Sequence, residues 1–282
     1  YRRDMNGLNP GPGFDAEGVT LLSWITIPEF GNHAWANDCW GYVSPSGREY
    51  AIIGLSDGTG FVEITNPGNA QVIGVIGGPQ STWRDVKVYD QYAYAVSEGG
   101  SGIQVIDLTQ IDNGTVTLAN TITTGGNAAT HNVAINVDSG YLYRTGGGSN
   151  GLRIYNLSNP VSPQFVASWS ARYVHDAQIV TYTSGPYAGK EIAFCCGGLN
   201  GGWEMTGLTI LDVTNKANII ELAHLQYSTG NYSHQGWLSP DKQYFYPGDE
   251  LDEDTLGYPT RTRLIDVSDL GNPTELNWFT NG

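Results

Sequence analysis

Short apolar stretches separated by polar or glycine-containing breaks run along nearly the whole chain. In one region they are VKVY, YAYAVS, GIQVIDL and TLANTI, in which β-branched and aromatic residues alternate with small or polar ones. Such alternation between Gly, Asn, Asp and Pro breaks is typical of β-strands. No long stretch has apolar residues at helical spacing together with helix caps. The pattern therefore predicts an all-β protein.

The same set of four stretches recurs five times along the chain. The second residues of the repeated units are Asp38, Asp85, Asn132, Asp176 and Gln235, so the successive spacings are 47, 47, 44 and 59 residues. Self-similarity near this period is typical of propellers and solenoids. Four antiparallel strands per unit, repeated radially, make a β-propeller. We therefore predict a single propeller domain over residues 1–282, with five four-stranded blades visible as repeats.

Two segments bear on whether the ring of blades closes. VTLLSWITIP, before the first unit, resembles a fourth strand and predicts a strand that completes a C-terminal blade, which would hide two sheet edges. The last unit, however, has a fourth strand of its own in TELNWF. Two alternatives follow: the last unit is divided differently, or the ring is incomplete within this chain.

The third strand of four units ends in Asp or Asn, followed two residues later by Ser or Thr. Asp and Asn side chains accept hydrogen bonds from nearby backbone N–H groups and so form turns. We expect a structural role, as the turn into the fourth strand, for Asp107, Asn156, Asp212 and Asp266.

The charge balance narrows the classes of partner. A formal net charge of −15 argues against nucleic acid, because phosphate binding needs clustered Lys and Arg. The acidic balance suits an extracellular surface, or one that attracts cations. No run of 18 apolar residues is present that would span a membrane. The chain begins at Tyr1 instead of Met, which favours a processed product.

Three cysteines, Cys39, Cys195 and Cys196, make an odd count. The simplest interpretation is free buried thiols, or one disulfide with a thiol left over. A strained vicinal disulfide, or a pair of soft metal ligands, at Cys195 and Cys196 is the alternative.

Several segments rich in Trp and His run through most of the chain: NDCWGY, GREYAIIG, WRDVKVYDQYAYAVSE, THNVAIN, YVHDAQIV and SHQGWLSPDKQYFYPGDELDE. In these segments the chain resembles the choice-of-anchor B proteins, whose blades carry LVIVD-type repeats. The resemblance implies a propeller that is exported and held at the cell surface, without a defined activity. The sequence departs from the family pattern at its C-terminus, where further repeats with His and Trp are expected.

Chemistry-bearing residues recur where first strands start and second strands end. The first strand of a blade lines the central channel, so these positions from successive blades meet at one mouth. His131, His175 and His234 start the first strands of three consecutive units, and we predict that they converge near the axis. The acidic residues expected at the same face are Asp38, Asp57, Asp85, Asp176, Glu98, Asp249 and Glu250.

Two interpretations of this convergence stay open. In the architectural one, the His, Asp and Asn side chains bond the backbone of the neighbouring blade. In the functional one, imidazole and carboxylate groups hold Zn²⁺ or another transition metal; the candidate ligands are His131, His175, His234, Asp176, Glu98, Asp249 and Glu250. The acidic run Asp249–Asp254 is an alternative Ca²⁺ site without EF-hand spacing. Asp38, Asp85 and Trp203 are candidates for contact with another ligand.

Two classes of function follow from these features. The first is a non-enzymatic module at the cell surface that binds a protein, a glycan, further copies of itself or a chain that completes the propeller. The second is a metal-dependent hydrolase that uses a metal-activated water at the channel mouth. The sequence contains no H-E-x-x-H pair, and it assigns no catalytic residue. A divalent metal, Ca²⁺ or Zn²⁺, is the only cofactor it implies.

Overall fold

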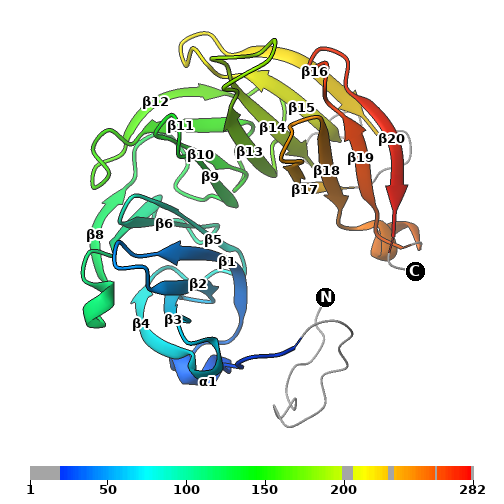
Figure 1. The fold of residues 1–282 in the computed structure, drawn as a ribbon. Helices are drawn as coiled ribbons and strands as arrows, with labels where there is room; N and C mark the ends of the chain where they lie inside the picture. The colour runs from blue at the N-terminus through cyan, green and yellow to red at the C-terminus, as the bar shows by residue number, and fades with distance from the viewer. Residues whose placement is uncertain (1–19, 199–205, 228–231, 258, 281–282) are drawn as a thin grey trace.

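The computed structural model describes residues 20–198, 206–227, 232–257 and 259–280. Its strands form five antiparallel sheets, each of four strands that follow one another in the chain and in space. Figure 1 shows the sheets as blades in an arc around a central axis, with the first strand of each blade innermost and the fourth on the rim. The prediction of an all-β propeller with five four-stranded blades is confirmed.

The five predicted units coincide with the five blades. The first two blades consist of β1 (Ala36–Val43), β2 (Glu49–Leu55), β3 (Gly58–Glu63), β4 (Gln71–Gly77), β5 (Arg84–Tyr89), β6 (Tyr92–Ser97), β7 (Ile103–Asp107) and β8 (Thr117–Ile122). The next two consist of β9 (Asn132–Asn136), β10 (Tyr141–Thr145), β11 (Leu152–Asn156), β12 (Gln164–Trp169), β13 (Asp176–Thr181), β14 (Glu191–Gly197), β15 (Gly207–Asp212) and β16 (Ile220–Gln226). The fifth consists of β17 (Ser233–Leu238), β18 (Tyr244–Asp249), β19 (Thr262–Asp266) and β20 (Thr274–Phe279).

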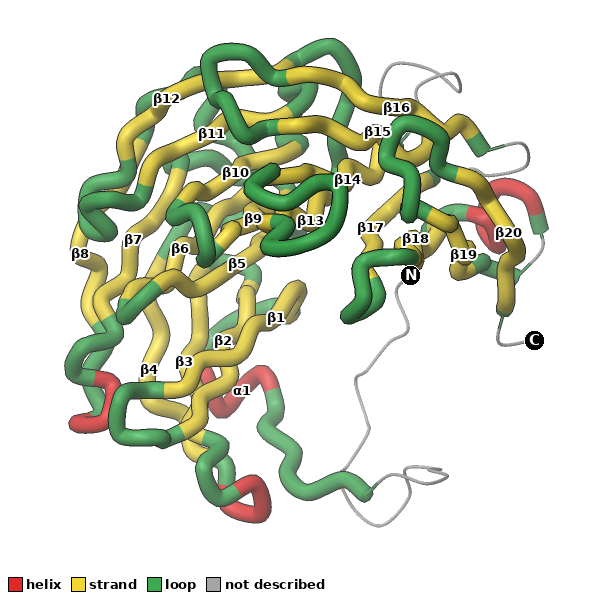
Figure 2. Tube along the Cα trace, turned by 45° about the horizontal axis from the view of Figure 1, so that its top comes forward, coloured by secondary structure: helices red, strands yellow, loops and turns green. Residues whose placement is uncertain are grey.

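Helical segments are confined to short turns in the described part of the chain, as Figure 2 shows. They are α1 (Ile27–Phe30), the 3-10 turns Pro67–Asn69 and Ile111–Asn113, and the π-type turn Asp252–Leu256. The last of these begins three residues after the end of β18 and contains Asp252, Glu253 and Asp254 of the acidic run.

The strand predicted from VTLLSWITIP does not form. From Thr20 onwards the segment contains no strand, and it ends in the helical turn α1. Pro28 lies in the first turn, where its missing N–H costs no hydrogen bond. The side chain of Phe30 lies over Gly60 of β3, where a Cβ would come within 2.8 Å of the ring. The segment therefore covers the first blade and adds no strand to the fifth.

The core lies between neighbouring blades. Four clusters of buried apolar side chains are found in the described residues, one at each junction between consecutive sheets. Between the fourth and fifth blades, for example, the rings of Phe194 and Phe245 stack with their centroids 5.3 Å apart. The first and fifth blades lie at the two ends of the arc (Figure 1).

Polar side chains of the innermost strands bind the backbone of the next blade. The N–H of Arg84 donates to Asn37, that of Val133 to Asp85, and that of Leu238 to Gln178, over 2.8–3.1 Å. The amide of Asn132 donates to the carbonyl of His175 over 3.2 Å. Every junction in the arc thus has a polar tie at the channel wall, which the architectural interpretation predicts for this position.

The turns into the fourth strands are also as predicted. Each of the four residues accepts a hydrogen bond from the backbone N–H two positions later, over 2.6–3.0 Å: Asp107, Asn156, Asp212 and Asp266. The side chain therefore satisfies a donor that the ladder leaves free, and these residues hold the blade together.

Replacing Asp107 with Ala should lower the free energy of unfolding by about 1 kcal/mol, because the N–H of Thr109 loses its acceptor. Asp107→Asn is the matched control, since an amide oxygen accepts the same bond. Urea unfolding at neutral pH measures both. Equal losses for Ala and Asn would contradict the assigned turn.

Candidate functional site

Three histidines from consecutive blades form one row at the channel mouth. The ring centroids of His131 and His175 are 4.2 Å apart, and those of His175 and His234 are 4.7 Å apart. Trp83 lies against His131 at 5.5 Å, and Tyr232 lies edge-on to His175 at 5.1 Å. The predicted convergence is confirmed, because the start of each first strand lies next to the axis.

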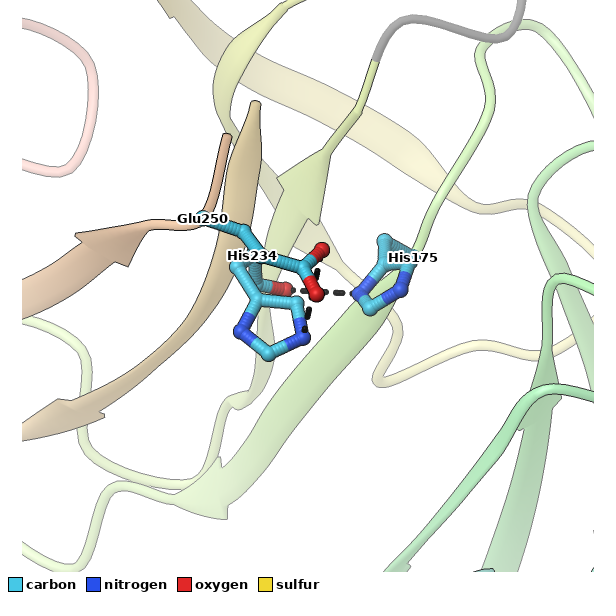
Figure 3. Close-up of side chains that lie close together, drawn as sticks. All are labelled: His175, His234 and Glu250. Carbon is cyan, nitrogen blue, oxygen red and sulfur yellow. Dashed lines mark hydrogen bonds and ion pairs between the residues drawn. The ribbon is translucent and has the colours of Figure 1, made fainter. Parts of the chain in front are cut away.

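The two glutamates at second-strand ends also lie at this mouth. Glu98 follows β6 and bonds Nδ1 of His131 over 2.7 Å. Glu250 follows β18, and its Oε2 is 3.7 Å from Nε2 of His234. One ligand atom each from His175, His234 and Glu250 lies within 4.8 Å of the other two, a spacing that fits a single metal ion. Figure 3 shows the three side chains turned toward one another.

A backbone contact fixes the tautomer of His175. Its Nδ1 is 3.0 Å from the carbonyl oxygen of His234. Because a carbonyl only accepts, Nδ1 carries the hydrogen and Nε2 keeps a lone pair. Metal-binding histidines are commonly oriented in this way, with the second ring nitrogen donating to a carbonyl or carboxylate.

The surroundings keep these imidazoles neutral. Burial, together with the neighbouring rings of His131 and His234, lowers the pKa of His175 to about 2. Burial also lowers the pKa of His234, although the carboxylate of Glu250 opposes that shift. Since a metal binds the neutral imidazole, both rings are in the ligating form at neutral pH.

Asp249, predicted as a ligand, lies with another partner. Its Oδ2 accepts hydrogen bonds from Nε and Nη2 of Arg263, over 3.0 and 2.7 Å, and both side chains are inaccessible to solvent. Burial raises the pKa of Asp249 to about 6 even though the hydrogen bonds from Arg263 oppose that shift. This carboxylate is therefore part of a structural ion pair inside the fifth blade.

The predicted aspartates of the first strands, Asp38, Asp85 and Asp176, gather around Lys87 of β5. The ammonium group is 2.5 Å from Asp85 and 3.6 Å from Asp38, and it lies 4.7 Å from the ring centre of Trp40. Burial raises the pKa of Asp85 well above its usual range despite Lys87. Burial raises the pKa of Asp176 to about 6, and Lys87 opposes that shift. These side chains are not in the histidine row.

Trp203 lies outside the described residues. The cysteines are free thiols: Cys39 is exposed, and Cys195 and Cys196 are buried.

Among the described residues the only metal-type cluster is the one at the histidine row, so the acidic run after Asp249 forms no second one. No described helix has the length and apolarity that a bilayer crossing requires.

The sequence also contains two G-x-S-x-G patterns, at residues 54–58 and 147–151. A nucleophile elbow needs a strand followed by a helix. Here each pattern connects two antiparallel strands, β2 to β3 and β10 to β11. Neither presents a nucleophilic serine in that geometry.

Lys87, Trp40 and Trp237 are channel residues that were not predicted from the sequence. Lys87 lies two residues after Asp85, and residues at this spacing share a face of a strand. Trp40 lies two residues after Asp38, and Trp237 lies two residues after Gln235, the second residue of the fifth repeated unit. That alternation was the available signal for all three.

Comparisons with known proteins support the fold. No protein-family model and no curated protein matches the sequence. A Bacteroides uniformis structure assigned as a 6-phosphogluconolactonase is 14% identical, with a TM-score of 0.63, covering 86% of this chain and 71% of that one. The periplasmic gluconolactonase of Pseudomonas aeruginosa is 12% identical, with a TM-score of 0.61, covering 86% and 70%. A Lactobacillus plantarum protein is 15% identical, with a TM-score of 0.58, covering 86% and 67%. Such likenesses establish a β-propeller.

Acid should destabilise the protein through His175. Its imidazole is neutral when folded and binds a proton below about pH 6.5 when unfolded. The unfolded state then holds more protons, so this residue makes stability fall by up to about 1.4 kcal/mol per pH unit as pH decreases below 6.5. His175→Gln, which keeps a donor toward the His234 carbonyl, should flatten that slope. Urea unfolding with EDTA at several pH values checks it; an unchanged slope would refute the assignment.

Breaking the buried ion pair between Asp249 and Arg263 should lower the free energy of unfolding more than removing the charge of Glu275, the partly exposed second partner of Arg263. Asp249→Asn leaves the charge of Arg263 buried and should lower the free energy of unfolding by about 3 kcal/mol. Glu275, which bonds the same guanidinium over 2.8 Å from a partly exposed position, supplies the control: Glu275→Gln should cost less than about 1 kcal/mol. Denaturant unfolding measures both, and equal losses would contradict the description.

Proposed function

We propose that this protein is an exported β-propeller module that binds a divalent transition metal at its channel mouth, through His175, His234 and Glu250. The observation that carries the proposal is the cluster itself, in which three ligand atoms lie within 4.8 Å of one another. Two neutral imidazoles and one carboxylate suit Zn²⁺ better than Ca²⁺, which takes oxygen ligands.

The export and cell-surface part of the proposal rests on other features. The resemblance to the choice-of-anchor B proteins and the net charge of −15 both favour a location outside the cell. One structural neighbour, with a TM-score of 0.50 and 11% identity, comes from a nidogen–laminin complex. That neighbour covers 85% of this chain. Because it comes from a protein complex, the likeness is compatible with a propeller that binds another protein. The partner class remains a protein, a glycan or a further copy of the chain.

A metal-dependent hydrolase is the second candidate, and one observation favours it. Three protein ligands are typical of catalytic zinc sites, which keep a fourth position for water. A zinc-bound water is acidic enough to act as a nucleophile at neutral pH. Hydrolysis of simple ester or lactone substrates that requires Zn²⁺ and is lost in His175→Ala would favour this function over a binding module.

Zinc should bind the wild-type chain at one ion per molecule. His175→Ala, His234→Ala and Glu250→Gln should each weaken binding by at least about tenfold, equivalent to about 1.4 kcal/mol. His33→Ala is the matched control, because His33 pairs with Asp57 outside the cluster. Calorimetric titration with Zn²⁺ and with Ca²⁺, plus elemental analysis of the purified protein, measures this. Binding that survives both histidine substitutions would overturn the proposed site.

A further inference from the structure

A second feature of the channel lies between the two ends of the arc. A cavity of about 410 Å³ is lined mainly by residues of the first and fifth blades, among them Asp38, Trp40, Trp237 and Tyr246. Lys87 of the second blade and Asp176 of the fourth complete the wall. A volume of this size is within the range of small-molecule sites. The histidines of the proposed metal site are not in its lining.

The charges on the cavity wall are unbalanced. The single ammonium group of Lys87 already pairs with Asp85 and Asp38. The hydrogen bond described for the carboxylate of Asp176 comes from the N–H of Ala177 over 2.8 Å, and no ion pair of Asp176 occurs within 4.0 Å in the part of the chain described. Even with Asp85 protonated, two carboxylates face one ammonium group. A cationic ligand would neutralise the excess negative charge on the cavity wall.

The aromatic walls favour an organic cation over a bare metal ion. Trp237 and Tyr246 face each other across β17 and β18, and 58% and 38% of their surfaces are exposed. Across the cavity, Lys87 already lies over the ring of Trp40. Aromatic faces attract cations, and quaternary ammonium groups are bound in such surroundings. The carboxylates here also form no three-ligand metal cluster within the described residues.

We propose that the cavity between the first and fifth blades binds a small organic cation bearing a quaternary or methylated ammonium group. Asp38 and Asp176 supply the negative charge, and Trp40, Trp237 and Tyr246 supply the aromatic faces. The site does not depend on a metal at the mouth, so each of the two proposals can fail without the other.

Calorimetric titration with choline, in EDTA and at constant ionic strength, tests the site. Choline should bind at least about tenfold more tightly than 3,3-dimethylbutanol, its neutral isostere, since about 1.4 kcal/mol of charge recognition is a factor of ten. Asp38→Asn and Trp237→Ala should each weaken choline binding by a similar factor. Trp278→Ala is the control, because Trp278 is an exposed tryptophan of β20 away from the cavity. Equal affinity for the neutral isostere, or binding of methyl glucoside but not of choline, would overturn the proposal.

Cys39 offers an independent test with the unmodified chain. It lines the same cavity and is exposed, whereas Cys195 and Cys196 are buried. A trimethylammonium methanethiosulfonate should modify Cys39 at least about tenfold faster than the sulfonate analogue, relative to a free thiol, because the local potential is negative. Choline should slow the reaction, and Asp38→Asn should reduce the preference. A preference for the anionic reagent, or no protection by choline, would rule out a cation site.

Discussion

Burial of apolar side chains between neighbouring sheets fixes the distances at the channel, and the candidate sites depend on those distances. Each junction packs the face of one sheet against the next, as Phe194 against Phe245 does between the last two blades. Because such interiors are close-packed, the innermost strands cannot shift independently. Residues 59 positions apart, such as His175 and His234, are therefore held in direct contact.

The channel wall places two demands on its polar side chains. Some bind the next blade, as Asp85 does with the N–H of Val133 and Gln178 with that of Leu238. Others, such as Asp176, keep a polar group directed at the channel. His175 ties the next blade through Nδ1, which donates to the carbonyl of His234, and its Nε2 keeps a lone pair. The architectural and functional interpretations are therefore compatible at this residue.

Two consecutive residues, His175 and Asp176, belong to different candidate sites. His175 belongs to the mouth cluster with His234 and Glu250, whereas Asp176 lines the cavity between the first and fifth blades. Consecutive residues of a strand point to opposite faces, so one strand start can serve both sites. The same alternation places Lys87 beside Asp85, although only the aspartate was predicted as a channel residue.

The sequence alone determined the strands, the five units and the turns at Asp107 and its equivalents, because these depend on alternation and on local side chain-to-backbone bonds. It also determined that His131, His175 and His234 converge, since equivalent positions of a radial repeat must meet at the axis. Only the tertiary structure decided that Asp249 pairs with Arg263, that Phe30 covers Gly60, and that Trp237 faces a cavity shared with the first blade. Those outcomes depend on which groups lie opposite one another after packing, and residue order does not specify that.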